Sequence, residues 1–183
     1  MPFKKAVGRL PRLLFQAAVV KLGDEIDEGQ IVKAVAIPWL ELTHKMLKDP
    51  DFSYKIPWRK LEELIAGAYV REGWDEVILT PRSGDSGRDI IAVKHGICKI
   101  RIIDQVKAYG PGQRVTANDV RALLGVLSSD LNVSKGFVTT TADFAPRIYE
   151  DPSIKPFLPY RLDLRDGVQL REWLLGLAGI IEK

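Results

Sequence analysis

The sequence predicts a mixed α/β fold in which a central mixed sheet is flanked by helices. Two observations lead to this prediction. Some segments repeat apolar residues at spacings of three and four, whereas others are short apolar runs bounded by turn residues. The two kinds of segment alternate along the last two thirds of the chain, as expected where helices cover a sheet. The 183 residues are enough to bury one core.

Residues 1–56 are expected to form an N-terminal extension, partly helical, ahead of a main domain that covers residues 57–183. Arginines interrupt the early apolar stretch and no small-residue cleavage site follows, so we interpret this start as part of the mature protein. Within the extension we expect an acidic loop at 23–30 and a short helix at 38–50, with proline in its first turn and beyond its end.

The main domain is expected to open with a helix over residues 59–72, whose apolar residues share one face and which Gly73 terminates. After this helix the pattern shifts to short strands separated by turn residues. The expected strands are 75–80, 88–94, about 97–107, 135–141 and 160–164, with a tight turn at 95–96. The expected helices are about 116–130, 142–150 and 168–180.

Composition excludes several classes of protein. The net charge of +3 is too small to indicate nucleic-acid binding by itself. The single cysteine, Cys98, stands within an apolar strand pattern, excludes an intramolecular disulfide and fits a reducing compartment. Charged residues interrupt every apolar run before it reaches membrane-spanning length, so we expect a cytoplasmic protein. His44 and His95 lie in unrelated segments, which argues against a zinc site or a serine triad.

Polar residues stand at the ends of two neighbouring predicted strands. Asp89 begins one strand after a glycine-rich loop, and Gln105 and Lys107 end the next. Side chains alternate across a strand, so Gln105 and Lys107 share a face, whereas Asp104 and Val106 point to the other. A hairpin brings Asp89 near them. Carboxylate and amide oxygens suit Mg²⁺, and a lysine can stabilise developing negative charge. Turn capping and a solvated strand end are the alternative.

Six segments of the main domain extend this pattern over residues 57–175. They are "WRKLEELIAGAYVREGW", "SGDSGRDIIAVK", "DQVKAY", "VRALLGVL", "KGFVTTTADFAPR" and "RLDLRDGVQLREWL". Their order resembles that of the PD-(D/E)XK nuclease superfamily, in particular the Mrr-like catalytic domain of restriction endonucleases. In this subfamily Gln-X-Lys replaces Asp/Glu-X-Lys, as it does in "DQVK".

The resemblance implies a restriction-endonuclease-like core and Mg²⁺-dependent hydrolysis of DNA, with Mn²⁺ as a substitute ion. It implies that Asp89 binds the metal, together with the side-chain oxygen of Gln105 and the backbone carbonyl of Val106. Lys107 would position the attacking water or stabilise the scissile phosphate. Asp89, Gln105 and Lys107 form the expected catalytic centre, together with Glu62.

The resemblance places Glu62 at the position of a glutamate on the family's first helix. There it would bind the metal through water or hold a second ion. The alternative is a solvated helix face, which we expect for the neighbouring Glu63. Asp85 is expected to order the loop before Asp89 rather than to bind metal.

Three residues are candidates for contact with DNA. Arg88 stands where the family more usually has a small apolar residue, and it can contact a phosphate or form a surface ion pair. Thr140 and Arg147 belong to the run "TTTADFAPR", which offers hydroxyl groups and a guanidinium to a phosphate backbone. Threonines at a strand end also have ordinary structural roles.

We therefore expect a Mg²⁺-dependent endonuclease that acts on double-stranded DNA in restriction or another defence role. One alternative is a structure-specific or repair nuclease. Another is a DNA-binding module that kept the fold but lost turnover, which Gln105 in place of a carboxylate leaves open. One cluster serves one phosphodiester at a time, so cleavage of both strands implies a homodimer or a partner subunit.

Overall fold

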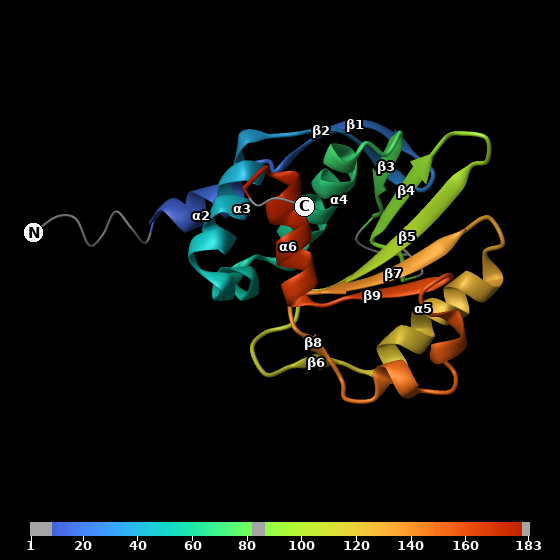
Figure 1. Ribbon diagram of the computed structural model, residues 1–183. Coiled ribbons are helices and arrows are strands. Elements are labelled where there is room, and N and C mark those ends of the chain that lie inside the picture. The colour runs from blue at the N-terminus through green and yellow to red at the C-terminus, as the bar shows by residue number, and fades with distance from the viewer. Residues whose placement is uncertain (1–8, 82–86, 181–183) are drawn as a thin grey trace, which may run out of the picture.

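The computed structural model describes residues 9–81 and 87–180, and these residues build a seven-stranded mixed sheet with helices on both faces (Figure 1). Its strands are β1 (Val20–Ile26), β2 (Gly29–Val35), β3 (Glu76–Leu79), β4 (Ile90–Lys94), β5 (Ile100–Lys107), β7 (Lys135–Thr140) and β9 (Leu162–Arg165). They are arranged in that order. Neighbours from β1 to β5 are antiparallel, whereas β5, β7 and β9 are parallel. The predicted fold class is confirmed.

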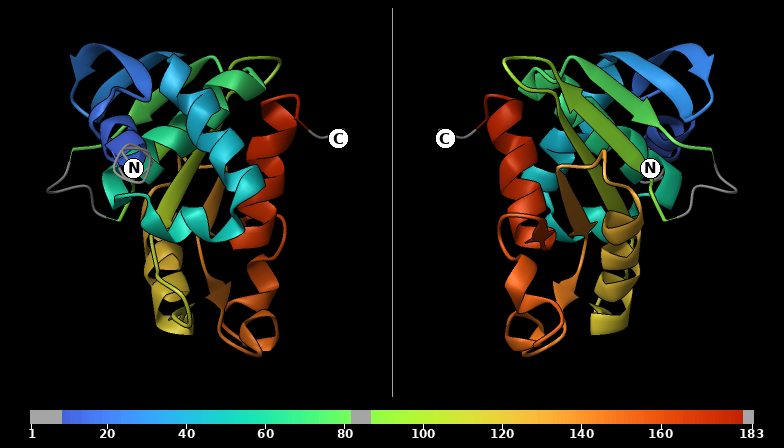
Figure 2. Two further views of the ribbon diagram at one scale, coloured as in Figure 1. Left: turned by 90° about the vertical axis from the view of Figure 1, so that its left-hand side faces the viewer. Right: turned by 90° about the vertical axis from the view of Figure 1, so that its right-hand side faces the viewer.

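Helices cover the two faces of the sheet unequally. The helices are α2 (Arg9–Gln16), α3 (Ile37–Lys48), α4 (Trp58–Glu72), α5 (Ala117–Ser129) and α6 (Gly167–Leu177), with short 3-10 turns η1 (Pro50–Lys55), η2 (Ile148–Glu150) and η3 (Lys155–Phe157). Helices α3, α4 and α6 lie on one side and α5 on the other (Figures 1 and 2). Strand alternation gives each face its own core: Ile90 and Ile102 pack with α4, and Ile91 and Ile103 with α5.

The N-terminal extension is built into the sheet of the main domain. Strand β2 pairs with β3 through Gln30 and Ile31, and Trp39 of α3 is fully buried, where its Nε1 donates to the carbonyl of Leu64 at 2.7 Å. The expected acidic loop at 23–30 is wrong, because β1 runs to Ile26 and β2 begins at Gly29. Most side chains of β1 are exposed, so this edge strand accommodates acidic residues.

The predicted helix at 142–150 is also wrong. Residues Asp143–Phe144 form β8, which pairs in parallel with β6 (Arg114–Val115), and only the 3-10 turn η2 follows. Pro146 and a positive φ of 63° at Arg147 are incompatible with a continuous α-helix. The β6–β8 pair lies at the opposite end of the molecule from the β1–β2 hairpin (Figures 1 and 2).

The hairpin of β4 and β5 has a longer connection than predicted. Strand β5 begins at Ile100, so residues 95–99 join the strands in place of a tight turn at 95–96. Cys98 lies in this connection and is exposed, not within a strand. The pairing itself is regular, from Ile90 opposite Asp104 to Lys94 opposite Ile100.

Helix α4 ends at the predicted glycine, and helix α5 begins close to the predicted residue 116. Helix α4 ends at Gly73, whose φ of 89° is accessible to glycine at little cost. Helix α5 begins after Thr116, which shares a reciprocal capping box with Asp119.

Within residues 9–81 and 87–180 no helix combines the length and apolar character needed to cross a membrane.

The close approach of α3 to α4 depends on Gly67. A methyl group there would lie 2.6 Å from Cδ1 of Trp39, so we expect Gly67→Ala to destabilise the protein by about 1–3 kcal/mol, the usual cost of overpacking. Gly125 lies within α5, where an added methyl group would meet no atom within 4 Å, and Gly125→Ala should stabilise by up to about 1 kcal/mol. Urea denaturation of both variants measures the two changes. Equal effects would show that the α3–α4 contact does not constrain Gly67.

Candidate active site

Asp89 lies immediately before β4 and is held by the end of β5. Its backbone N–H donates to the carbonyl of Asp104 at 3.1 Å, and its Oδ2 accepts the backbone N–H of Val106 at 2.6 Å. The carboxylate therefore takes the place of a backbone carbonyl just beyond the strand. This arrangement places Asp89 beside the polar end of β5, as the sequence predicted.

Gln105 lies on β5 with its side chain directed to the face that α5 covers. It follows Ile103 by two residues, and a methyl group on Gly87 would lie 3.2 Å from its Nε2. Only 8% of Gln105 is exposed. Within the described residues its buried Oε1 has no hydrogen-bond partner. Burying an amide oxygen without a hydrogen-bond donor costs folding free energy. The Oε1 of Gln105 therefore has the properties of a ligand atom for a cation or a hydrogen-bond donor.

Lys107 points to the same face as Gln105, toward the first turn of α5. Its Nζ lies 3.9 Å from Oδ1 of Asp119, and the hydroxyl of Tyr109 is 3.4 Å from the same oxygen. Partial burial opposes ionisation of Asp119, but hydrogen bonds from Thr116 and the charge of Lys107 hold its pKa below the usual range. A charged Asp119 thus orients the ammonium group of Lys107.

Glu62 is buried in the first half of α4 and is 4% exposed. Its Oε2 accepts a hydrogen bond from Arg59 at 2.8 Å. The solvated helix face that we considered for Glu62 is therefore wrong. Glu63 is partly buried too, because its carboxylate binds Lys60 at 2.8 Å and accepts the backbone N–H of Val19 at 3.4 Å. The N-terminal extension covers this part of the helix.

The candidates for DNA contact lie in different environments. Arg88 forms an ion pair with Asp130 at 3.1 Å, and both side chains are mostly buried, so the pair does not lie on the surface as expected. Thr140 is fully buried and its hydroxyl donates to the carbonyl of Lys107 at 2.8 Å, so the expected DNA contact by its side chain is wrong. Arg147 is exposed. Asp85 lies outside the described residues.

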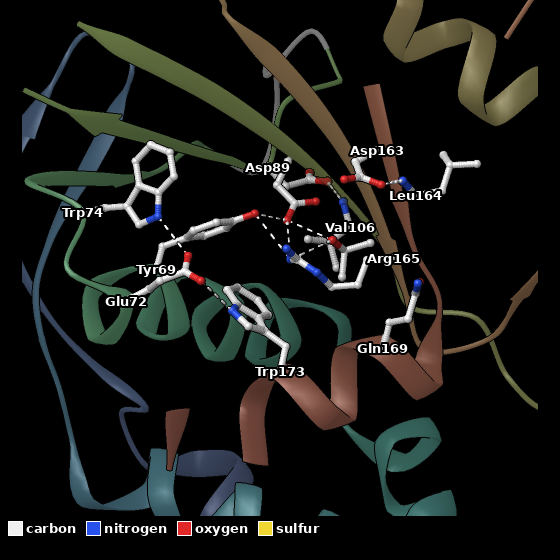
Figure 3. A network of polar contacts seen from close by, with 12 residues as sticks. Tyr69, Glu72, Trp74, Asp89, Val106, Asp163, Leu164, Arg165, Gln169 and Trp173 are labelled. Atoms are coloured by element: carbon white, nitrogen blue, oxygen red, sulfur yellow. Dashed lines mark hydrogen bonds and ion pairs between the residues drawn. The ribbon is translucent and has the colours of Figure 1, made fainter. Parts of the chain in front are cut away.

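Asp104 is fully buried, points to the opposite face of β5 and is the centre of a polar network. Figure 3 labels its partners Tyr69 and Arg165, with Trp173 beside them. The Oδ2 of Asp104 accepts hydrogen bonds from Tyr69 at 2.8 Å and Thr139 at 2.9 Å, and it lies 3.7 Å from the guanidinium of Arg165. The guanidinium carbon of Arg165 stacks 3.9 Å from the ring centre of Trp173. The network joins β5 to α4, β7, β9 and α6.

Burial sets the protonation of this network. It raises the pKa of the Asp104 carboxyl above its ordinary value, against the charge of Arg165 and the hydrogen bonds from Tyr69 and Thr139. Burial, together with the charge of Asp104, also raises the pKa of Tyr69 well above its usual range. Tyr69 is therefore a permanent donor. Because the backbone carbonyl of Asp104 accepts the N–H of Asp89, the network also supports the position of Asp89.

Sequence reasoning missed several residues that shape this site. Arg165 and Trp173 come from the last strand and helix, and no local pattern connects them with Asp104. Two other signals are visible in the sequence. Arg59 stands three residues before Glu62, a spacing that brings side chains together on a helix. Thr116 and Asp119 have the spacing of a capping box, which directs the carboxylate toward the start of α5.

The oxygen donors fit a hard divalent cation. Asp89 supplies a carboxylate, and beside it Gln105 supplies a buried oxygen that lacks a partner among the described residues. Both are ligand types that Mg²⁺ accepts, with water completing the shell. Among the described residues, no three His, Cys, Asp or Glu side chains gather as a metal centre.

A family comparison identifies the class of this domain. The chain belongs to the restriction endonuclease family Mrr_cat, whose model matches residues 53–174. No curated protein sequence matches the chain.

Two solved structures are similar to this fold. One is the MspJI restriction endonuclease in complex with a 27-mer oligonucleotide, with 19% identity and a TM-score of 0.50 over 77% of this chain and 36% of that one. The other is the DNA modification-dependent restriction endonuclease AspBHI, with 19% identity and a TM-score of 0.47 over 80% and 37%. The chain therefore spans little more than a third of each.

Removing Asp104 should destabilise the protein strongly. Asp104→Ala leaves Arg165 buried without its carboxylate, and losing one partner of a buried pair costs about 3–5 kcal/mol. Asp163→Ala is the control, because Asp163 pairs with Lys135 at a partly exposed site and should contribute about 0–1 kcal/mol. Chemical denaturation compares them. A loss for Asp104→Ala as small as that of the control would contradict the structural role of the network.

Proposed function

We propose that this chain is the catalytic domain of a Mg²⁺-dependent DNA endonuclease that acts in restriction. The observation that carries the proposal is the meeting of Asp89, Gln105 and Lys107 at one end of the β4–β5 hairpin, where the buried Oε1 of Gln105 lacks a partner among the described residues. Membership of the restriction endonuclease family supports the reaction class.

Each residue has a proposed role. Asp89 and Gln105 hold the metal ion by side-chain oxygens, and the backbone carbonyl of Val106 is a further ligand. The ion, when bound, supplies a Lewis acid that activates water and offsets negative charge on the phosphate. Lys107, oriented by Asp119, stabilises negative charge that develops on the scissile phosphate. Glu62 contributes through water or at a second ion.

Contacts with DNA beyond this centre are proposed for two arginines. Arg147 is exposed and lies just after β8, so it is available to a phosphate. Arg88 must first leave Asp130 to make such a contact, because the two are paired at 3.1 Å. A DNA phosphate would release Arg88 from Asp130 by competing for the same guanidinium group.

We expect Asp89→Ala to abolish Mg²⁺-dependent cleavage while DNA binding and the fold persist, because Asp89 is the carboxylate beside Gln105. Asp89→Asn is the matched variant, since its amide oxygen can still accept the N–H of Val106. Supercoiled plasmid, methylated or unmethylated, is incubated with each protein in Mg²⁺ or EDTA, and thermal unfolding is recorded in parallel. Full activity of a folded Asp89→Ala protein would place the catalytic centre elsewhere.

The same plasmid experiment separates the other functions. DNA binding without cleavage by the wild type would identify a non-catalytic DNA-binding module. Cleavage restricted to branched or damaged DNA would identify a structure-specific or repair nuclease. We propose that linear product requires a homodimer or a partner subunit, because one cluster serves one phosphodiester at a time. Light scattering with DNA present measures the molar mass of the complex and so gives the number of protein chains in it.

We expect Gln105→Glu to tighten Mg²⁺ binding in the absence of DNA. A carboxylate adds a negative charge beside the ion, and at an effective dielectric constant of about 20 two unit charges 4 Å apart interact by on the order of 4 kcal/mol before desolvation. Glu62→Gln should weaken binding. Calorimetric titration with Mg²⁺ or Mn²⁺, with and without a non-cleavable duplex, measures both. Unchanged affinity of Gln105→Glu without DNA would remove Gln105 from the coordination shell.

A further inference from the structure

Arg59 lies in the first turn of α4, and its side chain reaches the end of β3 next to the candidate active site. The same guanidinium nitrogen donates to Oε2 of Glu62 at 2.8 Å and to the backbone carbonyl of Thr80 at 3.1 Å. The side chains of Arg59 and Glu62 are 21% and 5% exposed. Water therefore screens this ion pair much less than a pair on the surface.

Thr80 connects Arg59 to the backbone of Arg88 and Asp89, just before β4. Its N–H donates to the carbonyl of Asp89 at 3.1 Å, and its hydroxyl lies 2.5 Å from the carbonyl of Arg88 and 3.2 Å from that of Asp89. A continuous series of hydrogen bonds thus runs from Glu62 through Arg59 and Thr80 to Asp89. The guanidinium is thus bound directly to the carboxylate of Glu62 and is linked to the backbone carbonyl of Asp89 through Thr80.

An arginine keeps its positive charge throughout the accessible pH range. A cation that approaches Glu62 therefore meets a permanent positive charge already bound to that carboxylate. Among the described residues, Arg59 offsets the charge of Glu62, and Lys107 and Asp119 offset each other. Arg59 therefore cancels one unit of the negative charge that could attract a divalent ion.

We infer that Arg59 is an internal counter-ion of Glu62 that weakens divalent-cation binding until a DNA phosphate supplies negative charge. The inference rests on the proposed function, because it assumes that the cation binds at Asp89 and Gln105. Arg59 acts as a positioning residue in this scheme. It sets the charge and orientation of Glu62 and makes metal loading dependent on DNA.

A second ion pair on α4 separates this role from simple bracing of the helix. Lys60 and Glu63 have the same spacing of three residues, the same 2.8 Å separation and similar burial, with side chains 17% and 14% exposed. Glu63 accepts the N–H of Val19 in the N-terminal extension, away from Asp89. Lys60→Gln therefore removes a matched charge from the same helix without changing the charge at the centre.

The experiment is calorimetric titration of Mg²⁺ and Mn²⁺ into DNA-free protein. We expect Arg59→Gln to bind the ion about tenfold more tightly than the wild type, because the carboxylate of Glu62 is no longer paired with a positive charge. Arg59→Lys, which keeps the charge, and Lys60→Gln should stay near the wild-type affinity. With a non-cleavable duplex, the gain from Arg59→Gln should shrink. Thermal unfolding shows which variants are folded.

A double-mutant cycle tests whether Arg59 acts through Glu62. In a Glu62→Gln background the gain from Arg59→Gln should largely disappear, because the counter-ion has lost its carboxylate. An equal gain in that background, or unchanged affinity of folded Arg59→Gln protein, would overturn the inference. If Arg59→Gln does not fold, Arg59→Lys decides: a tenfold gain with the charge retained also overturns it.

Failure of the proposed function has a different signature. In that case the wild type and Asp89→Ala would show the same metal affinity, both with and without the duplex. If Asp89→Ala abolishes metal binding but Arg59→Gln leaves it unchanged, the proposed function stands and only the role of Arg59 is lost.

Discussion

The pairing of β4 with β5 is the interaction on which the candidate site depends. It sets Ile90 opposite Asp104 and so carries Asp89 to the polar end of β5. There the carboxylate of Asp89 binds the N–H of Val106, which extends the ladder by one side-chain hydrogen bond. Isoleucines on both faces of the two strands pack into separate cores. The strand ends are therefore anchored from both sides before any ligand binds.

The two faces of β5 carry different polar residues, those of the candidate site on one face and a buried network on the other. The face toward α5 carries Gln105 and Lys107, whose polar groups stand at the edge of an apolar core. The face toward α4 and α6 carries Asp104, whose buried carboxylate joins four other elements. Alternation along a strand makes this division possible within four residues. Preorganised support of this kind is what a site needs if its ligands are to stay in place.

The N-terminal extension contributes to the site although it supplies none of the proposed ligands. It adds two strands to the sheet, and Val19 and Trp39 bind α4 through Glu63 and Leu64. This contact buries part of the helix that carries Arg59 and Glu62. The Arg59–Glu62 pair would be screened by water on an exposed helix. Here it is largely buried, so its electrostatic interactions with nearby charges are stronger.

Much of the fold follows from local patterns in the sequence. The helix and strand periods, the end of α4 at Gly73 and the start of α5 at Thr116 are visible without a structure. The alternation of Asp104, Gln105 and Lys107 on β5 is equally local. It predicted that Asp104 and Lys107 lie on opposite faces, and their contacts with Tyr69 and Asp119 agree with this.

Tertiary structure decided what each side chain meets. Four contacts join segments far apart in the chain. They are the bond from Thr140 to Lys107, the bond from Val19 to Glu63, the pairing of Arg88 with Asp130, and the stacking of Arg165 on Trp173. The acidic stretch of β1 became a strand only because β2 could pair with it. Local sequence determines which conformations of a segment are low in free energy. Burial and charge pairing depend on distant neighbours, and only the folded chain brings those neighbours together.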